Sequence, residues 1–153
     1  MKNDTRNKKS LPEQEVLHDQ TEITVRYNEA DPLGIVWHGH YLRYFEDGRE
    51  AFGKRYGISY MDFYLQGLAI PVVSVHCDFK KPLRYGHTIR IETTFINLPS
   101  AKMKFDYKVF ESGSDSPSAL GSSLQVFVDI KTFDLHLTIP GFFETWKRKW
   151  NLT

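Results

Sequence analysis

The sequence has little cysteine, no large excess of charge of either sign and no long hydrophobic run, and each absence excludes a class of protein. The 153 residues include one cysteine, Cys77, which excludes an internal disulfide framework and a cysteine-based zinc or iron–sulfur site. The 20 basic and 19 acidic side chains leave a formal net charge of +1, so no general field attracts nucleic acid or an anionic membrane. No stretch reaches the roughly 18 apolar residues of a membrane span, and the N-terminus lacks the apolar core of a secretory signal. We therefore expect a cytoplasmic protein that binds no nucleic acid and spans no membrane.

The chain length fits one globular domain that follows a short polar leader. Residues 1–19 are rich in Lys, Asn, Asp, Glu and Gln and lack sustained periodicity, which is typical of a mobile leader. Residues 20–153 are the predicted domain, in a chain long enough to bury roughly 70% of its unfolded surface. We expect this domain to fold on its own.

The segment from His40 to Tyr56 has the periodicity of an amphipathic α-helix. On a helical wheel its apolar residues occupy about half of the circle, and acidic and basic residues fill most of the remainder. Arg49 breaks this division, and we expect its side chain to reach solvent at the border of the apolar face. A short closing helix is expected from Phe142 to Trp150.

Apolar and polar residues alternate in five other segments, which predicts strands with one buried face. These segments are 21–27, 72–79, 89–95, 103–109 and 120–130. Short connections between the last four favour antiparallel neighbours. The expected fold class is therefore α+β in two layers, an antiparallel sheet around one long helix.

The loop before the long helix has the spacing Tyr27-x3-Asp31-x2-Gly34-x3-His38-x2-Tyr41. The proline after Asp31 biases that residue away from helical dihedrals, and Gly34 allows a positive φ, so the carboxylate is held in irregular backbone. Taken alone, an Asp-Pro-x-Gly loop is also an ordinary turn.

The full spacing resembles the hotdog-fold acyl-CoA thioesterases of the 4-hydroxybenzoyl-CoA thioesterase type. The resemblance covers about residues 20–145 and includes the stretch from Pro82 to Gly86 and the late Val128-Asp129 pair. It implies a curved antiparallel sheet around one central helix. It also implies hydrolysis of acyl-CoA or acyl-carrier-protein thioesters without a metal or bound cofactor.

The resemblance assigns roles to individual residues. Asp31 takes the position of the catalytic carboxylate, which acts as nucleophile or general base, and the backbone N–H of His38 takes the position that polarises the thioester carbonyl. The predicted catalytic residues are therefore Asp31 and His38. Further residues are expected to bind substrate or shape its site, namely Tyr27, Gly34, Trp37, Gly39, Tyr41 and Arg84.

The chemistry of thioesters is consistent with these roles. A thiolate leaves readily because thiols have pKa values of about 8 to 9, so a general acid is hardly needed. The enzyme must supply an ionised nucleophile or base, and it must stabilise the charge that develops on the carbonyl oxygen. Asp31 suits the first task, and the unpaired N–H groups of a helix start at residues 38–41 suit the second.

Several other interpretations of the sequence remain open. The chain could bind acyl thioesters or a carrier protein without turning them over, or it could dehydrate hydroxyacyl thioesters. Glu46 is expected to be a solvated or interface carboxylate, although related hotdog families use a helix glutamate. His38-Gly39-His40 is a poor metal pair because residues two apart on a helix diverge, so no metal is expected. Cys77 is expected to be a small core residue.

An isolated sheet of this kind leaves an edge and one helix face uncovered. We therefore expect a homodimer in which two sheets join, or a homotetramer. The resemblance implies that the acyl pocket lies at the subunit interface. Lys80, Lys81 and Arg84 could meet coenzyme A phosphates at its rim. Relatives often carry an acidic residue where this chain has His87, which bears on the placement of the coenzyme.

Overall fold

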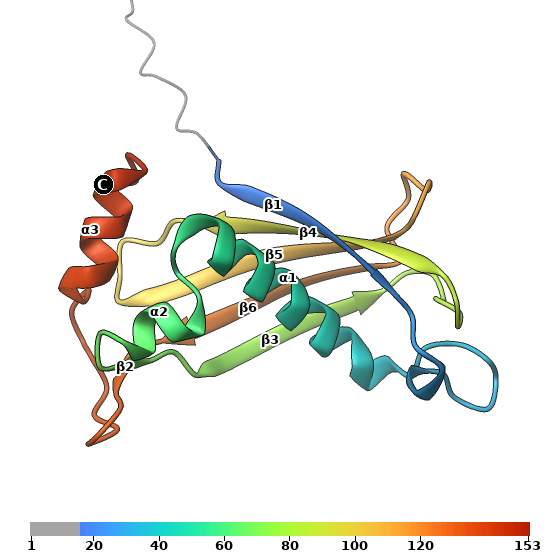
Figure 1. Cartoon of the computed structure of the whole chain (residues 1–153), viewed down its shortest axis with the longest axis horizontal. Helices are drawn as coiled ribbons and strands as arrows, with labels where there is room; N and C mark the ends of the chain where they lie inside the picture. The colour runs from blue at the N-terminus through green and yellow to red at the C-terminus, as the bar shows by residue number, and fades with distance from the viewer. Residues whose placement is uncertain (1–15) are drawn as a thin grey trace, which may run out of the picture.

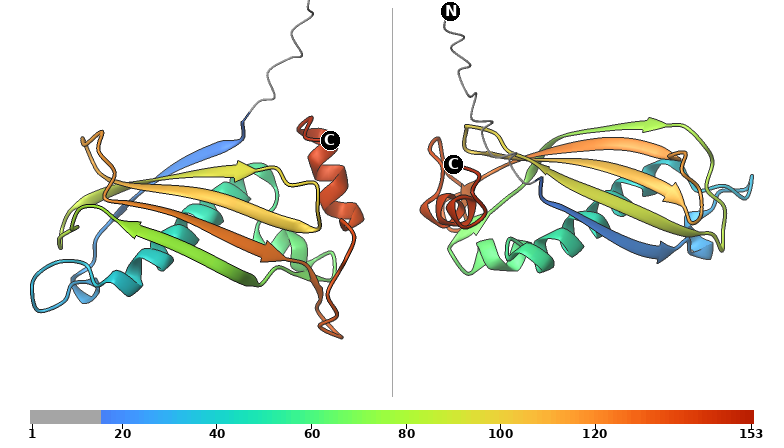
Figure 2. Two further views of the ribbon diagram at one scale, coloured as in Figure 1. Left: turned by 180° about the vertical axis from the view of Figure 1, so that it is seen from behind. Right: turned by 90° about the horizontal axis from the view of Figure 1, so that it is seen from above.

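One long helix, α1 (Tyr41–Tyr56), crosses one face of a five-stranded antiparallel sheet in the computed structural model, which describes residues 16–153 (Figure 1). The strands are β1 (His18–Thr24), β3 (Val72–Phe79), β4 (Thr88–Ile96), β5 (Lys102–Glu111) and β6 (Ala119–Val126). They lie in the order β1-β4-β5-β6-β3, so that β1 and β3 form the two edges. The views from behind and from above show α1 and α2 (Tyr60–Tyr64) on the same face of the sheet (Figure 2). This is the two-layer α+β architecture that the periodicity predicts.

The first strand begins earlier than its polar composition indicates. β1 starts at His18, and Leu17 before it is buried, so residues 18 and 19 of the predicted leader belong to the sheet. The pairing of His18 with Thr94 on β4 determines this boundary, and a partner so distant in sequence leaves no local signal. The rest of the leader, residues 1–15, lies outside the described residues.

The predicted strand over 120–130 is divided. β6 ends at Val126, Phe127 turns fully into the core, and β7 (Val128–Asp129) pairs with β2 (Leu68–Ala69) in a separate two-stranded sheet. A continuous apolar run does not reveal where a strand leaves one sheet for another.

Two glycines let α1 lie close to the sheet. A Cβ at Gly48 would lie 2.4 Å from Thr93 Oγ1, and a Cβ at Gly121 would lie 2.2 Å from Cζ of Phe45. The Phe45 ring instead stacks on Tyr107, with ring centroids 4.7 Å apart. The aromatic core between helix and sheet therefore depends on both small residues.

The prediction for Arg49 is wrong, because its side chain is fully buried. Its Nε donates to Gln125 Oε1 at 3.2 Å, and its Nη2 donates to the Ile58 carbonyl at 2.8 Å. The guanidinium also lies over the Phe105 ring, 4.7 Å from the centroid. Burial lowers the pKa of Arg49. Its partners come from a loop, β6 and β5, which a helical wheel cannot show.

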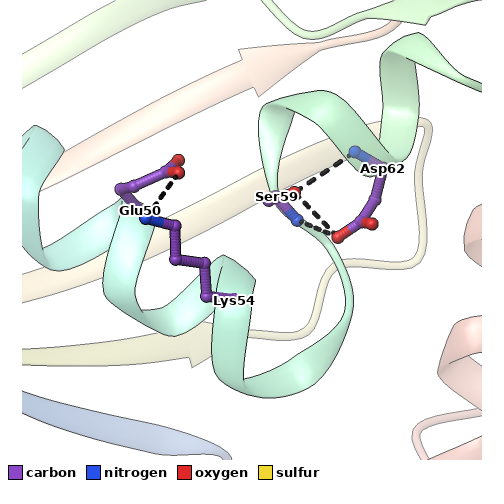
Figure 3. A network of polar contacts seen from close by, with 4 residues as sticks. All are labelled: Glu50, Lys54, Ser59 and Asp62. Atoms are coloured by element: carbon purple, nitrogen blue, oxygen red, sulfur yellow. Dashed lines mark hydrogen bonds and ion pairs between the residues drawn. The ribbon is translucent and has the colours of Figure 1, made fainter.

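The helix α1 ends at Gly57, where φ is +78°, and α2 follows after a capped turn. The Asp62 carboxylate accepts from the N–H and the hydroxyl of Ser59, each at 2.8 Å, while Ser59 Oγ accepts from the Asp62 N–H at 3.2 Å (Figure 3). This reciprocal capping stabilises a helix of one turn. Figure 3 also shows the exposed ion pair between Glu50 and Lys54, 3.5 Å long, on α1.

The predicted closing helix is present as α3 (Gly141–Lys149). It is joined to the end of α1 by Trp146, whose Nε1 donates to the Tyr56 carbonyl at 2.7 Å. Within residues 16–153, no helix combines the length and the apolar character that crossing a membrane requires.

Candidate active site

The loop between β1 and α1 contains two single-turn 3-10 helices, η1 (Tyr27–Glu29) and η2 (His38–His40). Between them the backbone folds back on itself, because the Asp31 N–H donates to the Ile35 carbonyl at 2.8 Å and the Gly34 N–H donates to the Asp31 carbonyl at 2.9 Å. Gly34 adopts a φ of +76°, which an L side chain would resist. The expected turn is therefore present, and glycine is what allows it.

A neighbouring loop anchors this turn to the body of the domain. The Val36 N–H donates to the carbonyl of the fully buried Leu83 at 2.8 Å, and Ile35 forms a bridge with Arg84. The position of Asp31 is thus determined by backbone hydrogen bonds on both sides.

The Asp31 side chain is half-buried. Its Oδ1 accepts from the Leu33 N–H at 2.8 Å. Among residues 16–153 its Oδ2 has no hydrogen-bond donor, so that oxygen is available to a substrate or a water molecule. A carboxylate with one oxygen held and the other available is chemically able to act as a nucleophile or a base.

The start of the helix offers two free donors. The Trp37 N–H donates to the Glu29 carbonyl at 3.0 Å and the His40 N–H donates to the Trp37 carbonyl at 3.0 Å. In the described part of the chain, the N–H groups of His38 and Gly39 have no backbone acceptor, as expected for the first residues of a helical segment. They lie at the positive end of α1, which favours a developing negative charge.

One cavity of about 320 Å³ joins the carboxylate to the helix start. Its lining comprises Asp31, Ile35, Val36, His38, Tyr41, Phe79, Lys80, Lys81 and Pro82. The Phe79 ring meets Tyr41 edge to face, with centroids 5.0 Å apart, and also contacts the His38 ring at 6.3 Å. Burial raises the pKa of the Tyr41 hydroxyl, which therefore stays neutral and can donate a hydrogen bond. The cavity thus has aromatic walls and two ammonium groups at its rim.

Other predicted site residues shape the loop or lie elsewhere. Trp37 is half-exposed and covers Gly39, where a Cβ would lie 2.1 Å from the indole. Tyr27 is 80% exposed and contacts Tyr85 in a different cavity, so the structure does not bring it to Asp31. Arg84 is exposed, and it does not line the cavity of Asp31.

Analysis of the sequence did not find Phe79, although this residue contributes an aromatic wall. The alternation over 72–79 places Phe79 on the same strand face as Cys77, but nothing local shows that this face meets the helix start.

Burial raises the pKa of the Cys77 thiol to about 11, so this side chain is protonated at neutral pH and is not a ready nucleophile. Glu46 is exposed and accepts from the Tyr60 hydroxyl at 2.8 Å, outside the Asp31 cavity.

A family model described as the thioesterase-like superfamily matches residues 25–146. The chain belongs to this superfamily. It is 36% identical over 112 residues to the Bacillus subtilis protein named "Putative acyl-CoA thioesterase YneP", covering 73% of this chain and 80% of that one. It is 33% identical over 87 residues to a protein of Aquifex aeolicus named "Putative esterase", covering 57% of this chain and 68% of that one.

A solved structure identifies the fold family of this domain. The DHNA-CoA thioesterase of Staphylococcus aureus superposes with a TM-score of 0.78 at 25% identity, covering 88% of this chain and 92% of that one. The predicted hotdog fold is therefore confirmed, with its antiparallel sheet and long central helix. Membership is confirmed for the superfamily as a whole, and the 4-hydroxybenzoyl-CoA type stays a prediction.

Proposed function

We propose that this superfamily member hydrolyses acyl-CoA or acyl-carrier-protein thioesters to a free acid and a thiol, with Asp31 as nucleophile or general base. The observation that carries the proposal is the single cavity that Asp31 shares with the start of α1. Membership of the superfamily and the similarity to a protein named as an acyl-CoA thioesterase support the reaction class.

The proposed reaction begins with the thioester carbonyl oxygen accepting from the free N–H groups of His38 and Gly39. Asp31 then acts in one of two ways. Its carboxylate attacks the carbonyl carbon, the carbon–sulfur bond breaks to release thiolate, and water hydrolyses the resulting anhydride. Alternatively, the carboxylate takes a proton from a water molecule whose oxygen attacks the carbonyl, and the thiolate leaves. One oxyanion donor typically contributes about 2.7 to 4 kcal/mol to lowering the barrier.

The lining of the cavity suits the two ends of such a substrate. Phe79 and Tyr41 offer apolar and aromatic surface to an acyl group. Lys80 and Lys81 carry positive charge at the rim, where phosphates of coenzyme A or an acidic carrier protein would lie. The S. aureus structure is of a DHNA-CoA thioesterase, and a relative in Crocosphaera subtropica is named "1,4-dihydroxy-2-naphthoyl-CoA hydrolase", so aromatic acyl-CoA substrates are the first to test.

A second copy of the chain would complete this site. β3 is an edge strand whose valines are exposed, with Val73 at 55% and Val75 at 43%, so its free backbone groups can pair with another strand. Pairing β3 with its own copy, antiparallel about a two-fold axis, would join the sheets and place the copy beside Phe79 at the end of the strand. We therefore propose a homodimer formed through β3, or a homotetramer built from such dimers.

Replacement of the carboxylate tests the proposal. The variant Asp31→Asn keeps the acceptor oxygen for the Leu33 N–H but cannot act as nucleophile or base at neutral pH. Release of free thiol from a panel of short, long and aromatic acyl-CoAs should fall at least 100-fold, while thermal unfolding stays close to that of the parent. A parental rate of hydrolysis in the variant contradicts the assignment. A parent protein that binds acyl-CoA saturably but releases no thiol would instead be a binding module.

A further inference from the structure

Glu29 is the most buried acidic residue in the described part of the chain, at 2% exposed. It does not line the cavity of Asp31 but a second and larger one, of about 570 Å³, bounded by the end of β1, by η1 and by one face of α1. Arg26, Arg43 and Asp47 line the same space, so its positive and negative side chains are balanced in number. A buried carboxylate costs free energy unless charges or hydrogen bonds compensate it. Glu29 is compensated in this way, and it lies outside the cavity in which the reacting atoms would meet.

The side chain of Glu29 fixes η1 just after β1. Its Oε1 accepts from the Arg26 N–H at 2.8 Å, and the Glu29 N–H donates to the Arg26 carbonyl at 3.1 Å. An acidic side chain at the third position of a helix commonly satisfies a backbone donor at the helix start in this way. The hydroxyl of Tyr44, buried on α1, lies close to the same carboxylate, since burial raises its pKa and Glu29 adds to the rise. The carboxylate therefore lies where η1 meets α1.

The main-chain carbonyl of Glu29 closes the loop that carries Asp31. It accepts from the Trp37 N–H at 3.0 Å, and Ala30 forms the next bridge with Val36. Asp31 lies inside this closed loop, and the two free N–H groups of the helix start follow directly after Trp37. The separation between the Asp31 carboxylate and those donors therefore depends on the hydrogen bond that the Glu29 carbonyl accepts.

We propose that Glu29 is a positioning residue for the proposed thioester hydrolysis: its side chain fixes η1, and its carbonyl then holds the free N–H groups of His38 and Gly39 in place relative to Asp31. This role needs the acceptor oxygen of the side chain and not its negative charge. The effect on rate rests on the proposed function, whereas the effect on the position of the helix start does not.

Replacement of the Glu29 side chain tests the role through kcat. Glu29→Ala removes the acceptor for the Arg26 N–H, so kcat for thiol release from acyl-CoA should fall about 10- to 100-fold while KM changes by less than about 3-fold. Glu29→Gln keeps an acceptor oxygen with the same reach and should restore kcat to within about 3-fold of wild type. If Glu29→Ala does not fold, Glu29→Asp replaces it, because its carboxylate keeps the charge but is one methylene shorter.

Asp62 provides a matched control, because its carboxylate accepts from the Ser59 N–H at the same 2.8 Å in the turn before α2. Loss of such a cap lowers Tm by about 1 to 8 °C, so Glu29→Ala and Asp62→Ala should be destabilised to a similar degree. Only Glu29→Ala should lose activity. The proposal is overturned if the two variants have the same kcat, or if Glu29→Gln loses as much kcat as Glu29→Ala.

Hydrogen exchange of the Trp37 amide, followed by NMR, reports on the helix start without any substrate. This N–H should exchange at least about 10-fold faster in Glu29→Ala than in wild type, but not in Glu29→Gln or Asp62→Ala. Unchanged exchange in Glu29→Ala overturns the proposal. If wild type releases no thiol from any thioester, the proposed function is contradicted, and the exchange pattern alone decides whether Glu29 positions the helix start.

Discussion

Replacement of Gly39 by alanine should displace the helix start on which the proposed oxyanion site depends. Gly39 is the middle residue of η2, and a Cβ built there would lie 2.1 Å from a ring carbon of Trp37. Carbon atoms that are not bonded cannot approach so closely, so either the half-exposed indole turns away or η2 moves. Overpacking of this kind typically costs about 1 to 3 kcal/mol of stability.

The effect on activity should exceed the effect on stability. The N–H groups of His38 and Gly39 must lie within hydrogen-bonding distance of the carbonyl oxygen, and a displacement of about 1 Å can cost about 100-fold in rate. We expect kcat of Gly39→Ala for thiol release from acyl-CoA to fall about 10- to 100-fold. Tm should fall by about 2 to 4 °C for each kcal/mol lost.

The matched control removes the Trp37 side chain, with which the added Cβ would clash. In Trp37→Ala the indole is absent, so adding Gly39→Ala to that variant should change kcat by less than about 3-fold if the clash is the cause. Two results would refute the reasoning. One is a parental kcat in Gly39→Ala. The other is a rate loss from Gly39→Ala that is as large without the indole as with it.

Two substitutions and one chemical modification test other features of the structure. Arg49→Met leaves two acceptors unpaired, Gln125 Oε1 and the Ile58 carbonyl, so it should lower the free energy of unfolding in urea by about 1 to 3 kcal/mol for each. If Arg49 were exposed to solvent, the same substitution would leave the free energy of unfolding almost unchanged. The pKa of Cys77 is about 11 against an ordinary value of 9.0, so below pH 9 its thiolate fraction is about 100-fold lower than that of an ordinary cysteine. Iodoacetamide should therefore alkylate the native protein slowly, and the rate should rise about tenfold per pH unit up to that pKa. Alkylation at the rate of a free thiol would contradict this. Val75→Pro should convert a dimer to a monomer in analytical ultracentrifugation, because proline removes a backbone donor in the middle of the edge strand; an unchanged dimer would show that another surface joins the copies.

The long helix and the alternating strands could be predicted because their signals are local. Each residue of α1 from Tyr41 to Tyr56 contributes to a period that is visible in 16 consecutive positions, and the strand over 72–79 has a period of two. Arg49 shows the limit of this reasoning. A charged residue on a helix is assigned to solvent unless its partners are known, and here they lie on β5, on β6 and in the turn after α1. Long-range pairing also determined the start of β1 at His18.

The candidate site also combines residues that local signals predict with residues that only long-range contacts bring in. Asp31, Gly34 and His38 lie within eight consecutive residues, so their spacing alone indicates a turn that leads into a helix. The opposite wall of the cavity, formed by Phe79 and the lysines that follow it, comes from a strand edge about 40 residues later. Tyr27 belongs to the same motif, yet η1 turns its ring toward Tyr85 and away from Asp31. Nearness in sequence was therefore sufficient to bring Asp31 and His38 to one cavity, but not to bring Tyr27 there.

The residues of one short motif are divided between the two cavities beside the start of α1. Asp31 and Glu29 are two positions apart, and the backbone between them turns so that one carboxylate lines the smaller cavity and the other lines the larger one. The Glu29 carbonyl accepts from the Trp37 N–H, so the segment that carries Glu29 also holds the first turn of the helix in place. This hydrogen bond links the backbone beside the larger cavity to the residue that precedes His38 and Gly39.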